Sequence, residues 1–113
     1  MTGWGEYDAA RFLLETPLIA SRTAPFVGEQ SFDWTGLFTA MRPWSHGEQL
    51  LVRAAFSLWR GHNDDATAET VDGDEVVLVG VSLGQIVWTL DNGNIERVLE
   101  AVQIYCKLGA YAR

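Results

Sequence analysis

The residues that could carry chemistry gather in one acidic stretch in the middle of the chain. Six carboxylates lie within twelve residues, and no basic residue interrupts them: Asp64, Asp65, Glu69, Asp72, Asp74 and Glu75. Carboxylates crowded in this way could bind calcium, could imitate the phosphates of nucleic acid, or could keep a loop in water. Each of these roles requires a particular spacing of the carboxylates, which can be checked in the sequence.

A calcium loop of twelve residues needs oxygen ligands at positions 1, 3, 5 and 12 and a glycine at position 6. If Gly73 takes position 6, Ala68 and Val79 fall on positions 1 and 12, where neither offers a side-chain ligand. If Gly93 takes position 6, Trp88 falls on position 1. Neither register supports calcium binding. We therefore expect no metal and no cofactor, and we interpret the stretch as the solvated arm of a hairpin.

Imitation of DNA would require carboxylates spread over a surface at the spacing of phosphates. The chain has a net charge of −7, and the six acids of residues 64–75 account for almost all of it. One acidic loop is a poor copy of a duplex, but it could dock on a basic patch of another molecule. An acidic inhibitor or nucleic-acid mimic acting through this loop is therefore our second functional hypothesis.

Catalytic residue types are few. The two histidines, His46 and His62, lie near opposite ends of one predicted helix, roughly 24 Å apart at 1.5 Å per residue, so they cannot share a metal. His46 beside Ser45 could act as a base, although Ser45 fits better as a helix cap. Cys106 lies on an apolar stripe, which is typical of a buried, inert thiol. No common catalytic or phosphate-binding motif is present. We expect a protein that is not an enzyme, and a small enzyme centred on His46 is the third hypothesis.

The elements that position these residues are mainly helical. Apolar periodicity predicts helices over residues 6–15, 34–41, 46–60, 83–90 and 94–107. Asp33 is a candidate cap for the second helix, and capping boxes beginning at Ser45 and Ser82 open the third and fourth. The wide stripe of residues 46–60 predicts burial on more than one side.

A hairpin is predicted between the third and fourth helices. Asp72-Gly73 is a two-residue turn signal that would pair residues 67–71 with 74–80. The β-branched run Val76–Val79 predicts a buried second strand. The fold class is therefore mainly α (α+β), with four or five helices and a small β-hairpin inserted before a C-terminal αα-hairpin.

The last two predicted helices have the lengths of a helix-turn-helix DNA reader. The outward positions of residues 94–107 carry no net positive charge, however, and no basic stripe is present to hold phosphates. We interpret the pair as a packing hairpin that buries its apolar stripes, and we expect no direct contact with nucleic acid.

The first sixty residues are rich in aromatic side chains, and residues 16–33 combine an irregular pattern with several apolar residues. A loop this apolar is expected to dock on its own domain or on a partner. We predict a single domain over residues 1–113, with an aromatic-rich, partly irregular segment at 1–44 and a compact helical core with the hairpin at 45–113.

The leading functional hypothesis is a small acidic accessory protein that binds another protein or forms a homo-oligomer. Its predicted contact surface is aromatic and consists of Trp4, Phe26, Phe32, Trp34 and Trp44. The single cysteine excludes an internal disulfide, and neither a secretory signal nor a membrane-length apolar run is evident. We therefore expect a cytoplasmic location and no membrane contact.

Overall fold

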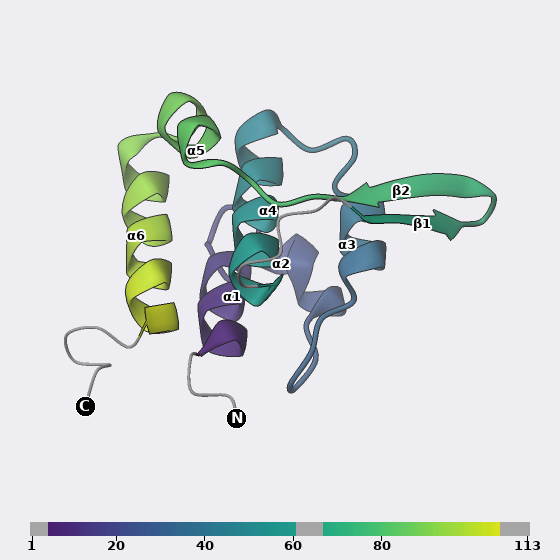
Figure 1. The fold of residues 1–113 in the computed structure, drawn as a ribbon, viewed down its shortest axis with the longest axis horizontal. Coiled ribbons are helices and arrows are strands. Elements are labelled where there is room, and N and C mark those ends of the chain that lie inside the picture. Colours follow the sequence, from purple (N-terminus) through teal and green to yellow (C-terminus); the bar gives the residue numbers. More distant parts are fainter. Residues whose placement is uncertain (1–4, 61–66, 107–113) are drawn as a thin grey trace.

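The computed structural model of the chain describes residues 5–60 and 67–106. Across these residues it is mainly α, with six α-helices, one 3₁₀ helix and a two-stranded antiparallel hairpin (Figure 1). In chain order the elements are α1 (Glu6–Leu14), α2 (Ala20–Thr23), η1 (Ala24–Phe26), α3 (Trp34–Ala40), α4 (His46–Arg60), β1 (Thr67–Val71), β2 (Asp74–Leu78), α5 (Leu83–Thr89) and α6 (Asn92–Cys106). The predicted fold class is confirmed, and α2 is a short helix that the periodicity did not indicate.

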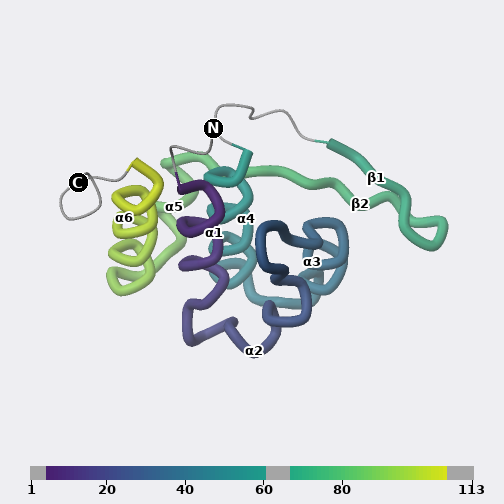
Figure 2. Tube along the Cα trace, turned by 90° about the horizontal axis from the view of Figure 1, so that it is seen from below, coloured from purple at the N-terminus to yellow at the C-terminus, as the bar shows by residue number. Residues whose placement is uncertain are grey.

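Helix α4 lies at the centre of the fold. Helix α1 packs against both α4 and α6, and α4 also contacts α5. Figures 1 and 2 show α6, α1 and α4 side by side, with α3 beyond α4 and the hairpin extending away from the helices. The central position of α4 accounts for its burial on several sides, because its neighbours approach from different directions.

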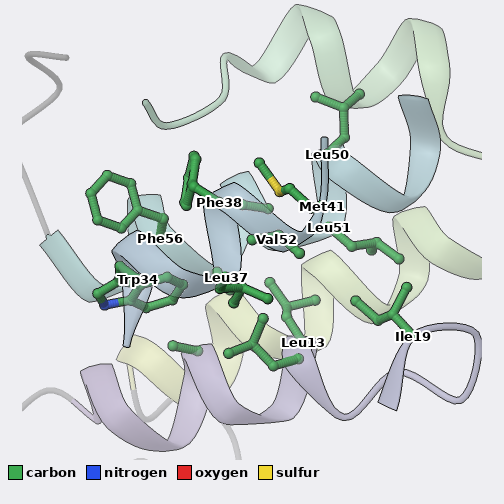
Figure 3. Packing of buried hydrophobic residues seen from close by; sticks show 14 of the residues in the cluster. Leu13, Ile19, Trp34, Leu37, Phe38, Met41, Leu50, Leu51, Val52 and Phe56 are labelled. Carbon is green, nitrogen blue, oxygen red and sulfur yellow. The ribbon is translucent and has the colours of Figure 1, made fainter. Parts of the chain in front are cut away.

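The core is built mainly from aliphatic and aromatic side chains of α1, α3 and α4 (Figure 3), and β2 and α6 add further apolar residues. The largest side chains with essentially no exposed surface are Leu13, Leu14, Ile19, Leu37, Leu50, Leu51 and Val52. Three consecutive buried residues in α4, at positions 50–52, point in directions about 100° apart. This arrangement is possible because partners surround the helix.

The three helix caps that the sequence predicted, at Asp33, Ser45 and Ser82, are in place. The Asp33 carboxylate accepts a hydrogen bond from the Gly36 amide at 3.0 Å, which opens α3. Before α5, the Ser82 hydroxyl accepts a hydrogen bond from the Gln85 backbone amide, and the Gln85 side chain accepts one from the Ser82 backbone amide. These caps depend on residues three positions apart, so a local sequence pattern is enough to find them.

The segment between α1 and α3 differs from the irregular chain that we predicted. It contains α2 and η1, and Val27 forms an isolated antiparallel bridge with Phe32. Two buried threonines support the turn: Thr16 donates to the Leu13 carbonyl, and Thr23 donates to the Leu14 carbonyl, both at 2.6 Å. Because these hydroxyls satisfy the last carbonyls of α1, the chain can reverse without leaving buried acceptors unpaired.

The hairpin forms at the predicted turn. Asp72 and Gly73 have φ of 51° and 85°, the left-handed values that a tight two-residue turn requires at both positions. The apolar run had predicted a buried second strand, but the strand is buried only in part. Val76 and Leu78 face the core, while Val77 between them is 48% exposed. Burial alternates along β2 because successive side chains of a strand point to opposite faces of the sheet, and one face of this two-stranded sheet is not covered.

Candidate functional site

The predicted aromatic contact surface is not one exposed surface in the structure. Trp34 is only 8% exposed and packs between Phe32 and Phe56, with ring centroids 5.0 and 5.1 Å away. Phe32 also stacks on Tyr7 and meets Trp59 edge-on. These rings join α1, the segment before α3, α3 itself and α4. The interface assignment is therefore corrected for Trp34, which belongs to the core because aromatic neighbours surround it.

The other members of that set lie at the edges of the core. Phe26 and Trp44 are half-buried, as is Phe32, and all three pack against core residues. The Arg22 guanidinium lies 4.5 Å from the centroid of the Trp44 ring and covers part of the ring. Trp4 lies outside the described residues. A contact role for Phe26, Phe32 and Trp44 remains a prediction.

The acidic loop is exposed wherever the structure describes it. Glu69, Asp72, Asp74 and Glu75 are all on the surface of the projecting hairpin (Figure 1). The Glu69 carboxylate accepts a hydrogen bond from the Thr35 hydroxyl at 2.8 Å, which ties the first strand to α3. Asp64 and Asp65 lie outside the described residues. In the described hairpin the carboxylates have no basic partner within ion-pair distance.

The surroundings of His46 are those of a helix start. Ser45 and Glu48 form the predicted capping box, with the Ser45 amide donating to Glu48 Oε1 at 3.0 Å and the Glu48 amide donating to Ser45 Oγ at 3.3 Å. Arg22 Nη2 lies 2.6 Å from Glu48 Oε2. These hydrogen bonds, chiefly the one from Arg22, lower the pKa of Glu48 from about 4.5 to about 2. His46 is exposed, and His62 lies outside the described residues.

A depression of about 820 Å³ lies open to solvent beside α1. It is lined mainly by polar residues of α1 and of the loop between Val27 and Phe32, with Trp59 from α4. Among residues 5–60 and 67–106, no three histidine, cysteine or acidic side chains come together in a way that could hold a metal ion. Cys106 is a free, half-buried thiol at the last residue of α6.

Arg53, whose side chain is half-buried, lines two smaller depressions. Its guanidinium donates to the Gly80 carbonyl at 2.9 Å and lies 3.4 Å from Gln85 Oε1. Burial lowers the pKa of Arg53. The contacts of this arginine fasten the chain between β2 and α5 to α4, which is a structural role.

The most exposed apolar side chains of the described protein lie on α5 and α6. Trp88 is 88% exposed and Leu83 is 76% exposed, and Val87, Leu99 and Val102 are also open to solvent. We call these five residues the α5–α6 apolar surface. The two helices are consecutive in the chain and lie at the same end of the molecule (Figures 1 and 2). The sequence prediction did not identify this surface, because Leu83, Val87, Leu99 and Val102 belong to stripes that we assigned to the core and Trp88 belonged to neither stripe.

The reason for the exposure is geometric. Ile86 of α5 and Leu90, which follows the last residue of the helix, pack against the core, so Leu83 and Val87 of the same stripe point elsewhere. In α6, Val98 and Ala101 are buried, and Leu99 is turned about 100° away from Val98. The apolar residues of each helix are spread more widely than the contact with the rest of the chain can cover. A second apolar face is left in water.

The charges near this surface are of one sign. Asp91, Glu96 and Glu100 are exposed, whereas the single arginine of α6 is turned inward. Arg97 donates to the Phe12 carbonyl at 2.6 Å and to the Thr16 hydroxyl at 2.9 Å. The described part of α5 and α6 therefore presents apolar side chains and carboxylates to solvent, without an exposed base.

Comparison with known proteins gave no match: no protein-family model, no curated protein and no solved structure is significantly similar to this chain. None of the helices in the described part of the chain combines the length and the hydropathy needed to cross a bilayer.

Proposed function

We propose that this protein is a non-enzymatic interaction subunit that binds another protein through the α5–α6 apolar surface. The observation that carries the proposal is the exposure of Trp88 together with Leu83 and Val87 on one short helix. Burying an aromatic side chain such as tryptophan removes on the order of 150–250 Å² of surface from water. Tryptophan is also one of the residue types enriched among the anchor residues of protein interfaces.

The composition of α5 supports the same function. Leu83–Thr89 contains no charged residue, so the helix lacks the solvated face that a surface helix of a monomer normally has. Exposed apolar residues on two adjacent helices go beyond the isolated apolar side chains that any surface carries. We place this interaction in the cytoplasm, in keeping with a single cysteine that leaves no internal disulfide to form.

A second candidate function has its own supporting observation. The hairpin extends away from the helices and carries four exposed acids, Glu69, Asp72, Asp74 and Glu75, at its end and along its strands. A projecting acidic arm is suited to docking on a basic patch. It ranks second because salt screens the charges on which such a contact relies. Exposure of the α5–α6 apolar surface to water is unfavourable, and binding of a partner would relieve it.

The test is the native mass of the protein recovered from its source cells, measured by light scattering. The monomer has a mass of 12.5 kDa. We expect the wild-type protein in a complex of defined larger mass and the Trp88→Ala variant at the monomer mass. Leu18→Ala is the matched control, because Leu18 is also a large exposed apolar residue but lies on the turn after α1. A wild-type monomer, or a complex equally sensitive to both substitutions, would reject the proposal.

A further inference from the structure

We infer that the occupant of the α5–α6 apolar surface is a protein whose own contact surface has an apolar centre flanked by lysine or arginine. This inference rests on the proposed function and names the chemistry of the partner. Asp91 lies three residues after Trp88, between the two helices, and Glu96 and Glu100 are exposed on α6, the helix that also carries Leu99 and Val102. A partner that covers Trp88 and Leu99 must come close to these carboxylates. A basic rim on the partner would complement them.

The structure argues against a second copy of this chain as the occupant. In an isologous dimer each copy would present the same surface, so Asp91, Glu96 and Glu100 of one copy would approach those of the other. The described part of α5 and α6 offers no exposed arginine to offset them, because its one arginine, Arg97, contacts Phe12 and Thr16. Like charges brought together at an interface oppose association.

The same carboxylates argue against a bilayer as the occupant. Helices that lie on membranes combine an apolar face with lysine and arginine, which attract anionic headgroups. The described part of α5 and α6 exposes acids instead, and its one arginine is held against Phe12. A protein with a basic rim is the class of partner that satisfies both the apolar residues and the acids.

The experiment uses two synthetic amphipathic helical peptides of equal length, with the same leucine stripe, one flanked by lysine and the other by glutamate. Binding to the full chain is measured by fluorescence anisotropy of the labelled peptide at physiological salt. We expect the lysine-flanked peptide to bind the wild-type protein and the glutamate-flanked peptide to bind at least tenfold more weakly. Trp88→Ala should weaken binding of the lysine-flanked peptide by about thirtyfold, the typical effect of truncating an anchor residue.

Two double variants with the same change in net charge separate local from overall electrostatics. Glu96→Gln with Glu100→Gln should weaken binding of the lysine-flanked peptide by about threefold to tenfold. Asp72→Asn with Asp74→Asn, on the hairpin, should change it less than about twofold, because charges beyond a Debye length of about 8 Å are screened. Equal effects of the two pairs would show that binding follows net charge, and would overturn the inference.

The remaining outcomes distinguish the two proposals. If both peptides bind equally and Trp88→Ala abolishes both, the surface binds apolar partners and the basic rim is wrong. If the lysine-flanked peptide binds and Trp88→Ala and Leu18→Ala have the same effect, the site itself is wrong and the proposed function fails with it. Failure of both peptides to bind the wild-type protein overturns the inference. A dimer that Trp88→Ala dissociates, or Trp88-dependent binding to phosphatidylcholine vesicles, would assign the surface to a second copy or to lipid.

Discussion

The guanidinium of Arg97 lies over the ring of Phe12, with its central carbon 4.0 Å from the ring centroid. Its nitrogens donate to the Phe12 carbonyl and to the Thr16 hydroxyl. One side chain of the last helix thus covers an aromatic face and satisfies a carbonyl near the end of the first helix. This contact, together with Val98 and Ala101, fixes how α6 docks, and therefore which of its apolar residues remain in water.

Loss of this contact should destabilise the whole fold. We expect Arg97→Ala to lower the free energy of unfolding by about 2–3 kcal/mol, because two charge-assisted hydrogen bonds and a partly buried cation–π contact disappear. Urea unfolding followed by circular dichroism measures the change. Arg11→Ala is the control, because its pair with Glu15 is exposed and should change the unfolding transition far less. Similar losses for the two variants would contradict the assigned role of Arg97.

The pair of Arg22 and Glu48 predicts a dependence of stability on acid. The pKa of Glu48 is lowered to about 2 in the folded protein, so folding favours the ionised carboxylate. Its contribution is fully present above the ordinary carboxyl pKa near 4.5 and is lost as the pH falls toward 2. Glu48→Gln keeps a capping side chain and should flatten this part of the profile of unfolding midpoint against pH. A profile unchanged from wild type would show that Glu48 is not the group responsible.

Gly36 should resist replacement although it lies in a helix. A Cβ at this position would overlap the Asp33 carboxylate that caps α3 and would press on the Phe26 ring. We expect Gly36→Ala to destabilise the protein by about 1 kcal/mol or more through loss of the cap, despite the better helix propensity of alanine. In an Asp33→Ala background the same substitution should cost less. Thermal unfolding of the four variants of this cycle measures the coupling.

The control for Gly36 is Gly84, which lies in α5 and whose Cβ position has only an ordinary contact, 3.9 Å from Ser82 Oγ. Gly84→Ala should stabilise the protein by up to about 1 kcal/mol, the ordinary difference between the two residues in a helix. If both glycine variants behaved alike, the steric argument for Gly36 would be wrong.

The turn of the hairpin gives a local prediction. Gly73 has φ of 85°, which an alanine adopts only with strain, so Gly73→Ala should loosen the hairpin by about 1 kcal/mol. Asp72→Asn should be neutral, because asparagine tolerates the left-handed conformation. Hydrogen exchange of the β1 and β2 amides is the appropriate measurement. We expect faster exchange in the alanine variant and no change in amides of α4; uniform acceleration across the chain would contradict a local effect.

Much of the fold was predictable because its signals are local. The caps at Asp33, Ser45 and Ser82 require residues three positions apart, and the Asp72-Gly73 turn requires two neighbours. The core-facing stripe of α4 was predictable for the same reason. The turn at Thr16 and Thr23 was not, since its hydrogen bonds depend on where α1 ends relative to the returning chain.

The candidate site shows what the sequence could not decide. Trp34 and Trp88 both lie on predicted helices, yet Phe32 and Phe56 surround the first and nothing in the described chain covers the second. One local signal pointed to Trp88, namely that Leu83–Thr89 has no charged residue. By itself the sequence determined the fold class, the starts of α1, α3, α4 and α5, the hairpin turn and the acidity of its arm. Only the tertiary structure decided which apolar stripes are buried, because burial depends on the partners that packing brings to each face of a helix.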